Sequence, residues 1–103
     1  MTAIEDLKNQ VKNIDRHDFK GRLDLLNQMI ELEPKNTTYL HEKAFLLITM
    51  ERENEAISTY DKIIEISGHD FAAYFRKGEI LRAFGHEKEA EICFHKASNP
   101  DEK

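Results

Sequence analysis

The chain is poor in cysteine and holds no long apolar run. Its 103 residues include a single cysteine, Cys93, so no disulfide can form within the chain, which suits a reducing compartment. No apolar stretch approaches the roughly 18 residues that a membrane helix needs. The opening residues 1–6 lack a charged segment followed by an apolar one, so no secretory signal is expected there. These absences predict a cytoplasmic protein without a membrane partner.

The chain also lacks an excess of positive charge. Asp and Glu number 20 against 15 Lys and Arg, and the formal net charge is −5. Proteins that bind nucleic acids usually carry a basic field, because contacts with phosphates dominate their affinity. The charge balance therefore argues against a nucleic-acid partner. With 40% hydrophobic and 34% charged residues, the composition is that of one small folded domain rather than a disordered chain.

Helix-breaking residues are scarce and regularly placed. Both prolines and two of the four glycines, Pro34, Gly68, Gly85 and Pro100, follow a segment with helical apolar spacing, as residues beyond helix ends do. No alternating run is long enough to predict a sheet. Six helices are therefore expected, at residues 3–16, 19–32, 37–50, 53–66, 71–84 and 87–98.

The sequence repeats itself with a period of 34 residues. Apolar and small positions in the middle of the chain return one period later: Leu40, Ala44, Leu47, Ala56 and Tyr60 as Tyr74, Gly78, Leu81, Ala90 and Phe94. One period earlier, the positions of Tyr60, Ile63 and Ile66 are occupied by Leu26, Met29 and Leu32. The chain thus contains three related units.

This period and pattern resemble the tetratricopeptide repeat family. The third unit fits best, from Tyr74 to Ala97. The second has Gly68 where the family has a closing proline. The first keeps that proline as Pro34, but Arg22 stands where a small alanine is usual, and its turn looks one residue short. The resemblance covers nearly the whole chain.

The resemblance implies an all-α fold, an α-solenoid of three antiparallel helix-turn-helix hairpins. A single domain over residues 1–103 is expected, with repeats at about 3–36, 37–70 and 71–100 and a flexible tail at 101–103.

Small residues stand where the helices of such hairpins have to cross. Ala44 with Ala56, and Gly78 with Ala90, leave the room that a close approach of two helices requires. Phe94 is then expected to fill the gap between neighbouring helices, since burying an aromatic ring is worth on the order of 1.5–3 kcal/mol.

No pattern of catalytic or metal-binding residues is present in the sequence. The five histidines are nowhere three or four residues apart, so no helix presents a paired metal-binding face. The glycines are widely scattered and form no phosphate-binding loop. We therefore expect no enzyme activity, no bound metal and no cofactor.

In the family that the sequence resembles, the first helix of each hairpin lines a concave groove that takes a peptide or a helix of a partner protein. By position, the groove would be lined by Lys8, Asn9, Lys12, His41, Glu42, Phe45, Ile48, Thr49, Phe75, Arg76, Glu79 and Arg82. The chain is therefore expected to be a protein-interaction module, an adaptor or a scaffold. Three repeats offer a small groove, so a contact below about 1,200 Å² and micromolar affinity are expected.

Three of these groove residues are apolar. Phe45, Ile48 and Phe75 lie off the helix faces that the repeat pattern buries. Apolar residues on a groove are candidate anchors for a partner, and the alternative is that each packs partly against an adjacent helix.

Four of the groove residues are basic. Arg76 and Arg82, with Lys8 and Lys12 opposite, form a candidate basic lip for an acidic peptide or a C-terminal carboxylate, and the alternative is an ordinary solvated face.

One subtype of the family, the co-chaperones, holds the carboxylate at the end of chaperone tails. Lys8 and Arg76 match the residues of that clamp, but Lys12, Glu42 and Ala72 stand where the clamp has Asn, Asn and Lys. Glu42 would repel a carboxylate. Strong binding of acidic chaperone tails is therefore not expected.

Two other functions compete with this hypothesis. The chain could be a self-associating structural unit, a homodimer formed through the first helix or through a surface at Ile92 and Cys93. An RNA-binding helical repeat has a similar period, but the acidic balance of the chain disfavours it.

Overall fold

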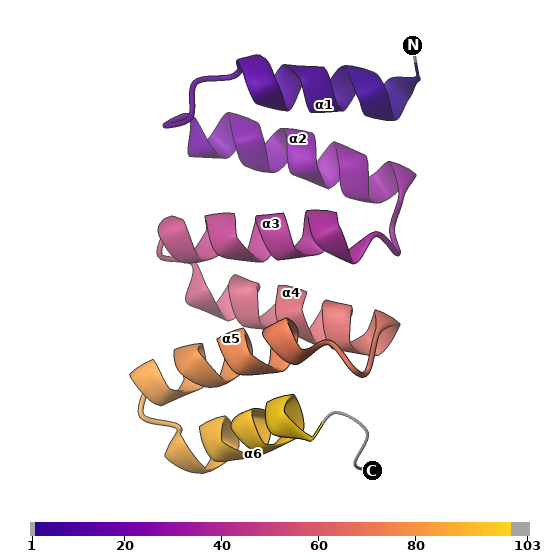
Figure 1. The fold of residues 1–103 in the computed structure, drawn as a ribbon. Coiled ribbons are helices and arrows are strands. Elements are labelled where there is room, and N and C mark those ends of the chain that lie inside the picture. Colours follow the sequence, from indigo (N-terminus) through magenta and orange to yellow (C-terminus); the bar gives the residue numbers. More distant parts are fainter. Residues whose placement is uncertain (1, 100–103) are drawn as a thin grey trace.

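Six helices stacked side by side make up the described part of the chain (Figure 1). The structure is a computed structural model, and it describes residues 2–99. The helices are α1 (Ala3–Asn13), α2 (Phe19–Leu32), α3 (Thr37–Thr49), α4 (Glu53–Ile66), α5 (Phe71–Ala83) and α6 (Glu87–Ser98). Each runs antiparallel to the one before it, and no strand occurs between residues 2 and 99. The predicted all-α solenoid of helical hairpins is confirmed. The predicted flexible tail, 101–103, lies outside the described residues.

The helices begin at a fixed interval. The first helices of the three hairpins begin at Ala3, Thr37 and Phe71, and the second helices begin at Phe19, Glu53 and Glu87. Both series follow the 34-residue period of the sequence. The stack that results measures 45 × 27 × 16 Å. Among the described residues, no helix has the length and apolar content to cross a membrane.

The predicted end of the first helix is wrong. α1 stops at Asn13, because Ile14 already has extended backbone angles, φ −75° and ψ 148°. The Asp15 carboxylate accepts a hydrogen bond from the His17 backbone N–H at 2.8 Å, and Asp18 accepts one from the Gly21 N–H at 2.9 Å. Aspartates that bond to nearby backbone groups compete with the helix, so the chain forms a longer turn before α2. The expectation that this turn is one residue short is also wrong, because α1 and α2 each begin one full period before α3 and α4.

The second and third hairpins share a different turn. Glu51 and Gly85, one period apart, both have a positive φ, 59° and 84°. In each turn the next residue donates its backbone N–H to the carbonyl five residues earlier, from Arg52 to Leu47 at 2.8 Å and from His86 to Leu81 at 2.9 Å. This is the Schellman arrangement, which satisfies carbonyl groups at the end of a helix.

The core follows the small residues that the sequence repeats. Ala44, Ala56 and Ala90 are 0% exposed. At Gly78 an added Cβ would lie 2.7 Å from the nearest atom of the Phe94 ring, so the ring occupies the space that a side chain would need. The predicted packing of Phe94 over the α5–α6 crossing is confirmed, although this ring also remains half-buried rather than fully enclosed.

Candidate functional site

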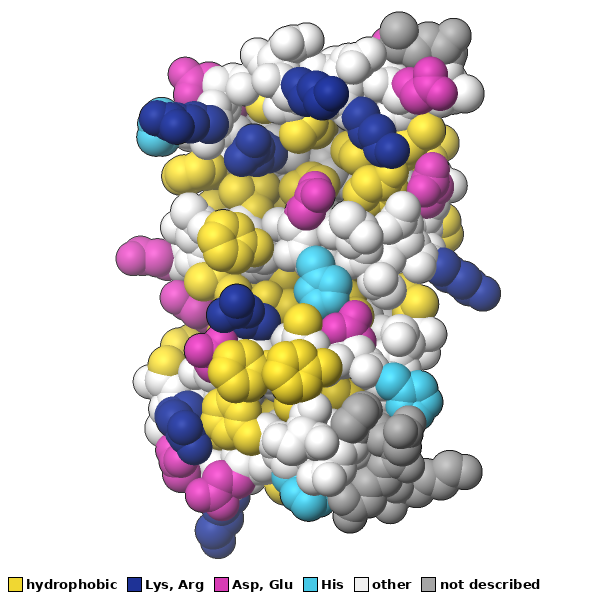
Figure 2. Space-filling view, in the orientation of Figure 1, with side chains coloured by type: hydrophobic (Ala, Val, Ile, Leu, Met, Phe, Trp, Pro, Cys, Tyr) yellow, Lys and Arg dark blue, Asp and Glu magenta, His cyan; other side chains and the backbone are white. Residues whose placement is uncertain are grey.

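Three neighbouring pockets lie along one face of the stack. The first-repeat pocket, about 570 Å³, is lined by α1, α2 and α3; the middle pocket, about 340 Å³, lies mainly between α3 and α5; the third-repeat pocket, about 580 Å³, is lined by α5 and α6. Phe45 lines the first two pockets, and Glu79 and Ala83 line the last two. The three pockets together are called the groove below. Figure 2 shows apolar rings exposed over α3 and α5 on this face.

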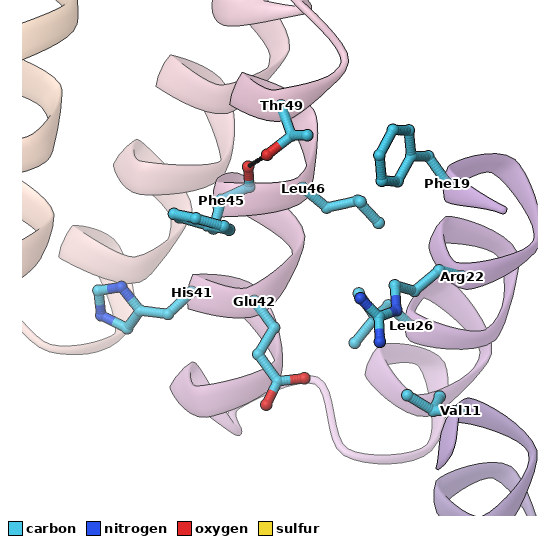
Figure 3. Close-up of a pocket in the computed structure, with 9 residues that line it drawn as sticks. All are labelled: Val11, Phe19, Arg22, Leu26, His41, Glu42, Phe45, Leu46 and Thr49. Carbon is cyan, nitrogen blue, oxygen red and sulfur yellow. Dashed lines mark hydrogen bonds between the residues drawn. The ribbon is translucent and has the colours of Figure 1, made fainter. Parts of the chain in front are cut away.

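Helix α3 brings four of the predicted groove residues to the first-repeat pocket. They are His41, Glu42, Phe45 and Thr49 (Figure 3). The Phe45 ring is 68% exposed, and the Thr49 hydroxyl donates a hydrogen bond to the Phe45 carbonyl oxygen at 3.1 Å. An aromatic ring exposed to this extent makes few packing contacts within the chain and can be covered by a partner.

The side chain of His41 is held by the start of the third hairpin. Its Nε2 lies 2.9 Å from Oδ2 of Asp70, and Oδ1 of Asp70 accepts the Ala73 backbone N–H at 3.0 Å, which caps α5. The imidazole also packs against Tyr60, with ring centroids 6.0 Å apart. His41 therefore fixes the second hairpin to the third as well as lining the groove.

Three phenylalanines form an aromatic cluster at the third-repeat pocket. Phe71 and Phe75 stack with centroids 5.9 Å apart and an interplanar angle of 11°, and Phe75 meets Phe94 at 5.6 Å and 56°. The guanidinium carbon of Arg82 lies 4.6 Å from the centroid of the Phe94 ring, at cation–π distance. Phe71 is 57% exposed and Phe75 is 38% exposed. The cluster presents a broad apolar surface with one cation on it.

Sequence reasoning missed Phe71 and Phe94 as groove residues. Phe71 stands four residues before Phe75, a spacing that places two side chains on the same helix face, and this signal was available in the sequence. Phe94 was expected only as a packing residue, but it also lines the third-repeat pocket because Gly78 lets the ring lie close to α5.

The predicted basic lip is not formed by the arginines of the third repeat. Arg76 Nη1 lies 2.9 Å from Glu79 Oε1, and Arg82 Nη2 lies 2.9 Å from Glu87 Oε1. All four side chains are about half exposed, so each pair contributes little to stability. Each guanidinium group nevertheless has a carboxylate beside it, which weakens the case for a basic lip at this end of the groove.

Ile48 packs partly against neighbouring helices, which was the alternative to its role as an exposed anchor. Its side chain is partly buried and packs against the hydrophobic core, although it also lines the middle pocket. Ile48 therefore contributes more to the floor of the groove than to an exposed anchor.

The residues of α1 that were predicted to line the groove, Lys8, Asn9 and Lys12, line none of the three pockets, and both lysines are exposed. Lys8 Nζ lies 6.0 Å from the centroid of the Tyr39 ring on α3. Neither Lys8 nor Lys12 forms an ion pair with any residue of the described range. Asn9, the third predicted residue of this helix, is also exposed.

Arg22 is another pocket residue that was not assigned to the groove from the sequence. It projects from α2 into the first-repeat pocket beside Val11 and Leu26 (Figure 3). Its Nε atom is buried without a hydrogen-bond partner. The sequence signal was its place in the repeat, one period before Ala56, where the family pattern has a small residue.

The lone cysteine lies away from this groove. Cys93 is buried within α6, and burial raises the pKa of its thiol above the usual value. Of the two residues that were predicted to form a dimer contact, Ile92 is therefore exposed and Cys93 is not. Among residues 2–99, no three His, Cys, Asp or Glu side chains are grouped closely enough to hold a metal ion.

Comparison with known proteins gives three findings. A family model described as "Tetratricopeptide repeat" matches residues 37–70 and 71–99. The TPR repeat-containing protein MJ1428 of Methanocaldococcus jannaschii is 27% identical over 97 residues, which is 94% of this chain and 17% of that protein. The crystal structure of MamA matches with a TM-score of 0.78 over 82% of this chain and 50% of that one, at 24% identity, which is a likeness of fold. The chain thus spans half or less of the length of both proteins.

Proposed function

Because the chain belongs to the tetratricopeptide repeat family, we propose that it is a protein-binding module whose groove takes an extended segment or a helix of a partner protein. Repeats of this family generally mediate contacts between proteins and typically form scaffolds rather than enzymes. We propose no catalytic activity for the chain. The predicted cytoplasmic location and the predicted absence of a nucleic-acid partner stay predictions.

The observation that carries the proposal is the row of exposed rings along the groove. Phe45, Phe71 and Phe75 are 68%, 57% and 38% exposed and line adjoining pockets. Aromatic rings that remain exposed in a concave surface are the residues that most often anchor a partner. A partner that covers these rings removes apolar area from water and gains free energy of binding.

The dimensions limit the size of the bound segment. An extended chain rises roughly 3.3 Å per residue, so about 14 residues would span the 45 Å length of the stack. A contact of this size buries less than about 1,200 Å², which corresponds to the weak and transient class of interfaces. We therefore expect a micromolar dissociation constant for a linear segment.

A displayed library of random peptides of about 16 residues, enough to cover the stack at roughly 3.3 Å per residue, tests the proposal. Peptides selected on the wild-type chain should bind the Phe45→Ser/Phe75→Ser variant at least about tenfold more weakly, because the two anchors are lost. The matched control is Leu32→Ser/Ile92→Ser, which removes two side chains that are 51% and 57% exposed but line none of the three pockets. Equal binding of the selected peptides to the wild type and the groove variant would reject the groove.

Self-association is the second candidate function, and the exposure of Ile92 favours it. This side chain is 57% exposed on the outer side of the last helix, where a second copy could cover it. Light scattering coupled to size exclusion measures the outcome directly. A dimer that dissociates in Ile92→Ser, but not in Phe45→Ser/Phe75→Ser, would support self-association outside the groove.

A further inference from the structure

Arg22 occupies a repeat position that the other two units fill with alanine. Ala56 and Ala90, one and two periods later, are 0% exposed at the crossings of their hairpins. A guanidinium group cannot be enclosed in such a crossing, because burying an unpaired charge is costly. In the first hairpin the side chain instead turns into the first-repeat pocket, between α2 and α3 (Figure 3).

The guanidinium group of Arg22 has no protein partner there. Its neighbours around the pocket are the apolar side chains of Val11, Phe19 and Leu26. Nε is excluded from solvent and makes no hydrogen bond, and the guanidinium forms no ion pair within residues 2–99. Nε is the one Arg22 side-chain nitrogen that is both buried and without a partner, and the side chain as a whole is only partly buried. Hydrogen bonds to an ionised group are stronger in apolar surroundings than in water.

The charges around the pocket favour an anion. Lys8 and Lys12 do not line the pocket, but they are exposed on α1, which contributes Val11 to it, and make no ion pair with the described residues. Dark blue side chains accordingly gather over α1 and α2 in Figure 2. The one acidic residue that lines the pocket is Glu42, which is exposed and does not bond to Arg22. Arg22 is thus the one Lys or Arg among the described residues that line the pocket, and exposed cations gather over the neighbouring helices in a chain whose formal net charge is −5.

We propose that the first-repeat pocket binds the carboxylate of an aspartate or glutamate side chain in the partner segment, through the terminal nitrogens of Arg22. This inference rests on the proposed function of the groove. The residue beside that acid in the partner is apolar and packs on the Phe45 ring, which lines the same pocket. A planar guanidinium suits this role because it can donate two parallel hydrogen bonds to one carboxylate.

A side chain fits the pocket better than the end of a chain. The pocket opens sideways into the middle pocket through Phe45, so a segment that runs along the groove passes over it and can insert a side chain. A terminal carboxylate would require the partner to stop at this point. Glu42 and Ala72 also replace two polar residues of the clamp that holds terminal carboxylates in the related co-chaperones.

The first experiment is the selection of internal peptides on the wild-type chain. The library is displayed as an N-terminal fusion, so that the peptides have no free C-terminus. Selected peptides should share an aspartate or glutamate next to an apolar residue. Synthetic copies in which Asn or Gln replaces that acid should bind about 10- to 100-fold more weakly, as expected for the loss of a hydrogen-bonded charge pair.

The second experiment assigns the effect to Arg22. In Arg22→Ala the acidic peptide and its Asn or Gln copy should bind equally, whereas Arg22→Lys should keep part of the preference for the acid. Lys20→Ala is the matched control, because it removes one positive charge from the exposed side of α2 without touching the pocket. Thermal unfolding confirms that the variants fold, and the midpoint of Arg22→Ala should not fall.

The outcomes separate the two proposals. Peptides that need Phe45 and Phe75 but show no acidic residue, or that bind Arg22→Ala as well as the wild type, would overturn the carboxylate site and leave the groove in place. Amidation of the peptide C-terminus should change the dissociation constant by less than about twofold. This is well below the tenfold change that corresponds to about 1.4 kcal/mol of binding free energy. A larger loss on amidation would overturn the assignment to a side chain. Failure of every peptide to bind the wild type would overturn both proposals.

Discussion

The first and third hairpins place different residues at the same point of the repeat. Ala90 is 0% exposed at the crossing of α5 and α6, and Phe94 one turn later covers Gly78. The matching positions of α2 hold Arg22 and Leu26, and α1 and α2 pack less extensively against each other than α5 and α6 do. Both hairpins border a pocket of similar volume, about 570 Å³ in the first repeat and about 580 Å³ in the third, but aromatic rings line the third pocket whereas the first contains the charged group of Arg22. One backbone arrangement thus provides two chemically different ends of a single groove.

This difference shows that the small residues of the repeat determine which side chains line the neighbouring pocket as well as how closely the helices pack. Where both helices carry small side chains, the space between them is filled by the ring of Phe94. Where a long side chain replaces alanine, the crossing cannot close around it, because protein interiors are packed without spare volume. The residue at this point therefore decides what lies beside the crossing, which is a phenylalanine ring over Gly78 in the third hairpin and a charged side chain in the first-repeat pocket.

The largest expected effect comes from transferring the residue of the first hairpin to the third. Ala90→Arg should lower the free energy of unfolding by at least about 3–5 kcal/mol, because an unpaired charge and a long side chain enter a fully enclosed site. The reverse exchange, Arg22→Ala, should change it by less than about 1 kcal/mol, since lost packing of the arginine stem offsets removal of the unbonded Nε. Urea denaturation measures both. Similar losses of unfolding free energy in the two variants would show that the helix crossings of the first and third hairpins are packed equally tightly.

A smaller effect is expected at the close approach beneath Phe94. Gly78→Ala should destabilise the chain by about 1–2 kcal/mol, because the added Cβ would clash with a ring that Phe75 and Arg82 hold in place, and this outweighs the better helix propensity of alanine. Gly68→Ala is the control. Its Cβ would meet nothing closer than a backbone oxygen at 4.0 Å. It should be neutral or stabilising by up to about 1 kcal/mol. Equal shifts of the two unfolding midpoints would refute the clash.

The smallest effect concerns the turn that the second and third hairpins share. Glu51→Gly should stabilise the chain by about 0.5–1 kcal/mol, because glycine accepts a positive φ without the steric cost that a glutamate bears. Gly85→Ala should destabilise it by about 1 kcal/mol for the same reason. The first hairpin, which passes through Asp15 and Asp18 instead, has no equivalent position. Thermal unfolding of the two variants measures whether each unfolding midpoint rises or falls. A lower midpoint for Glu51→Gly would contradict the steric cost that we assign to Glu51.

Most of the fold was predictable because its causes are local. Five of the six predicted helices have their ends within one residue of the structure, since apolar spacing and breakers act over a few residues. The one clear error was the end of α1, where the aspartates at 15 and 18 bond to the backbone and end the helix early. Four of the five predicted groove residues of α3 also line one pocket, because one helix face carries them, and Ile48 lines the next pocket.

The charges of the groove were less predictable. The four cations of the predicted lip looked equivalent in the sequence, yet Arg76 and Arg82 are paired with glutamates while Lys8 and Lys12 are not. Pairing depends on side-chain directions and on the distance between helix ends, which spacing along one helix does not give. The position of Arg22 in the first-repeat pocket was hidden for the same reason, because its place in the repeat could be assigned but the direction of its side chain could not.

By itself, the sequence determined the helices, their 34-residue interval and the antiparallel hairpins, because periodic apolar and small residues can be buried together in only one way at that spacing. Only the tertiary structure decided which crossings close, which rings stay exposed and which charges find partners. Those features depend on distances of a few ångströms between side chains of different helices, and the spacing of residues along the sequence does not give these distances.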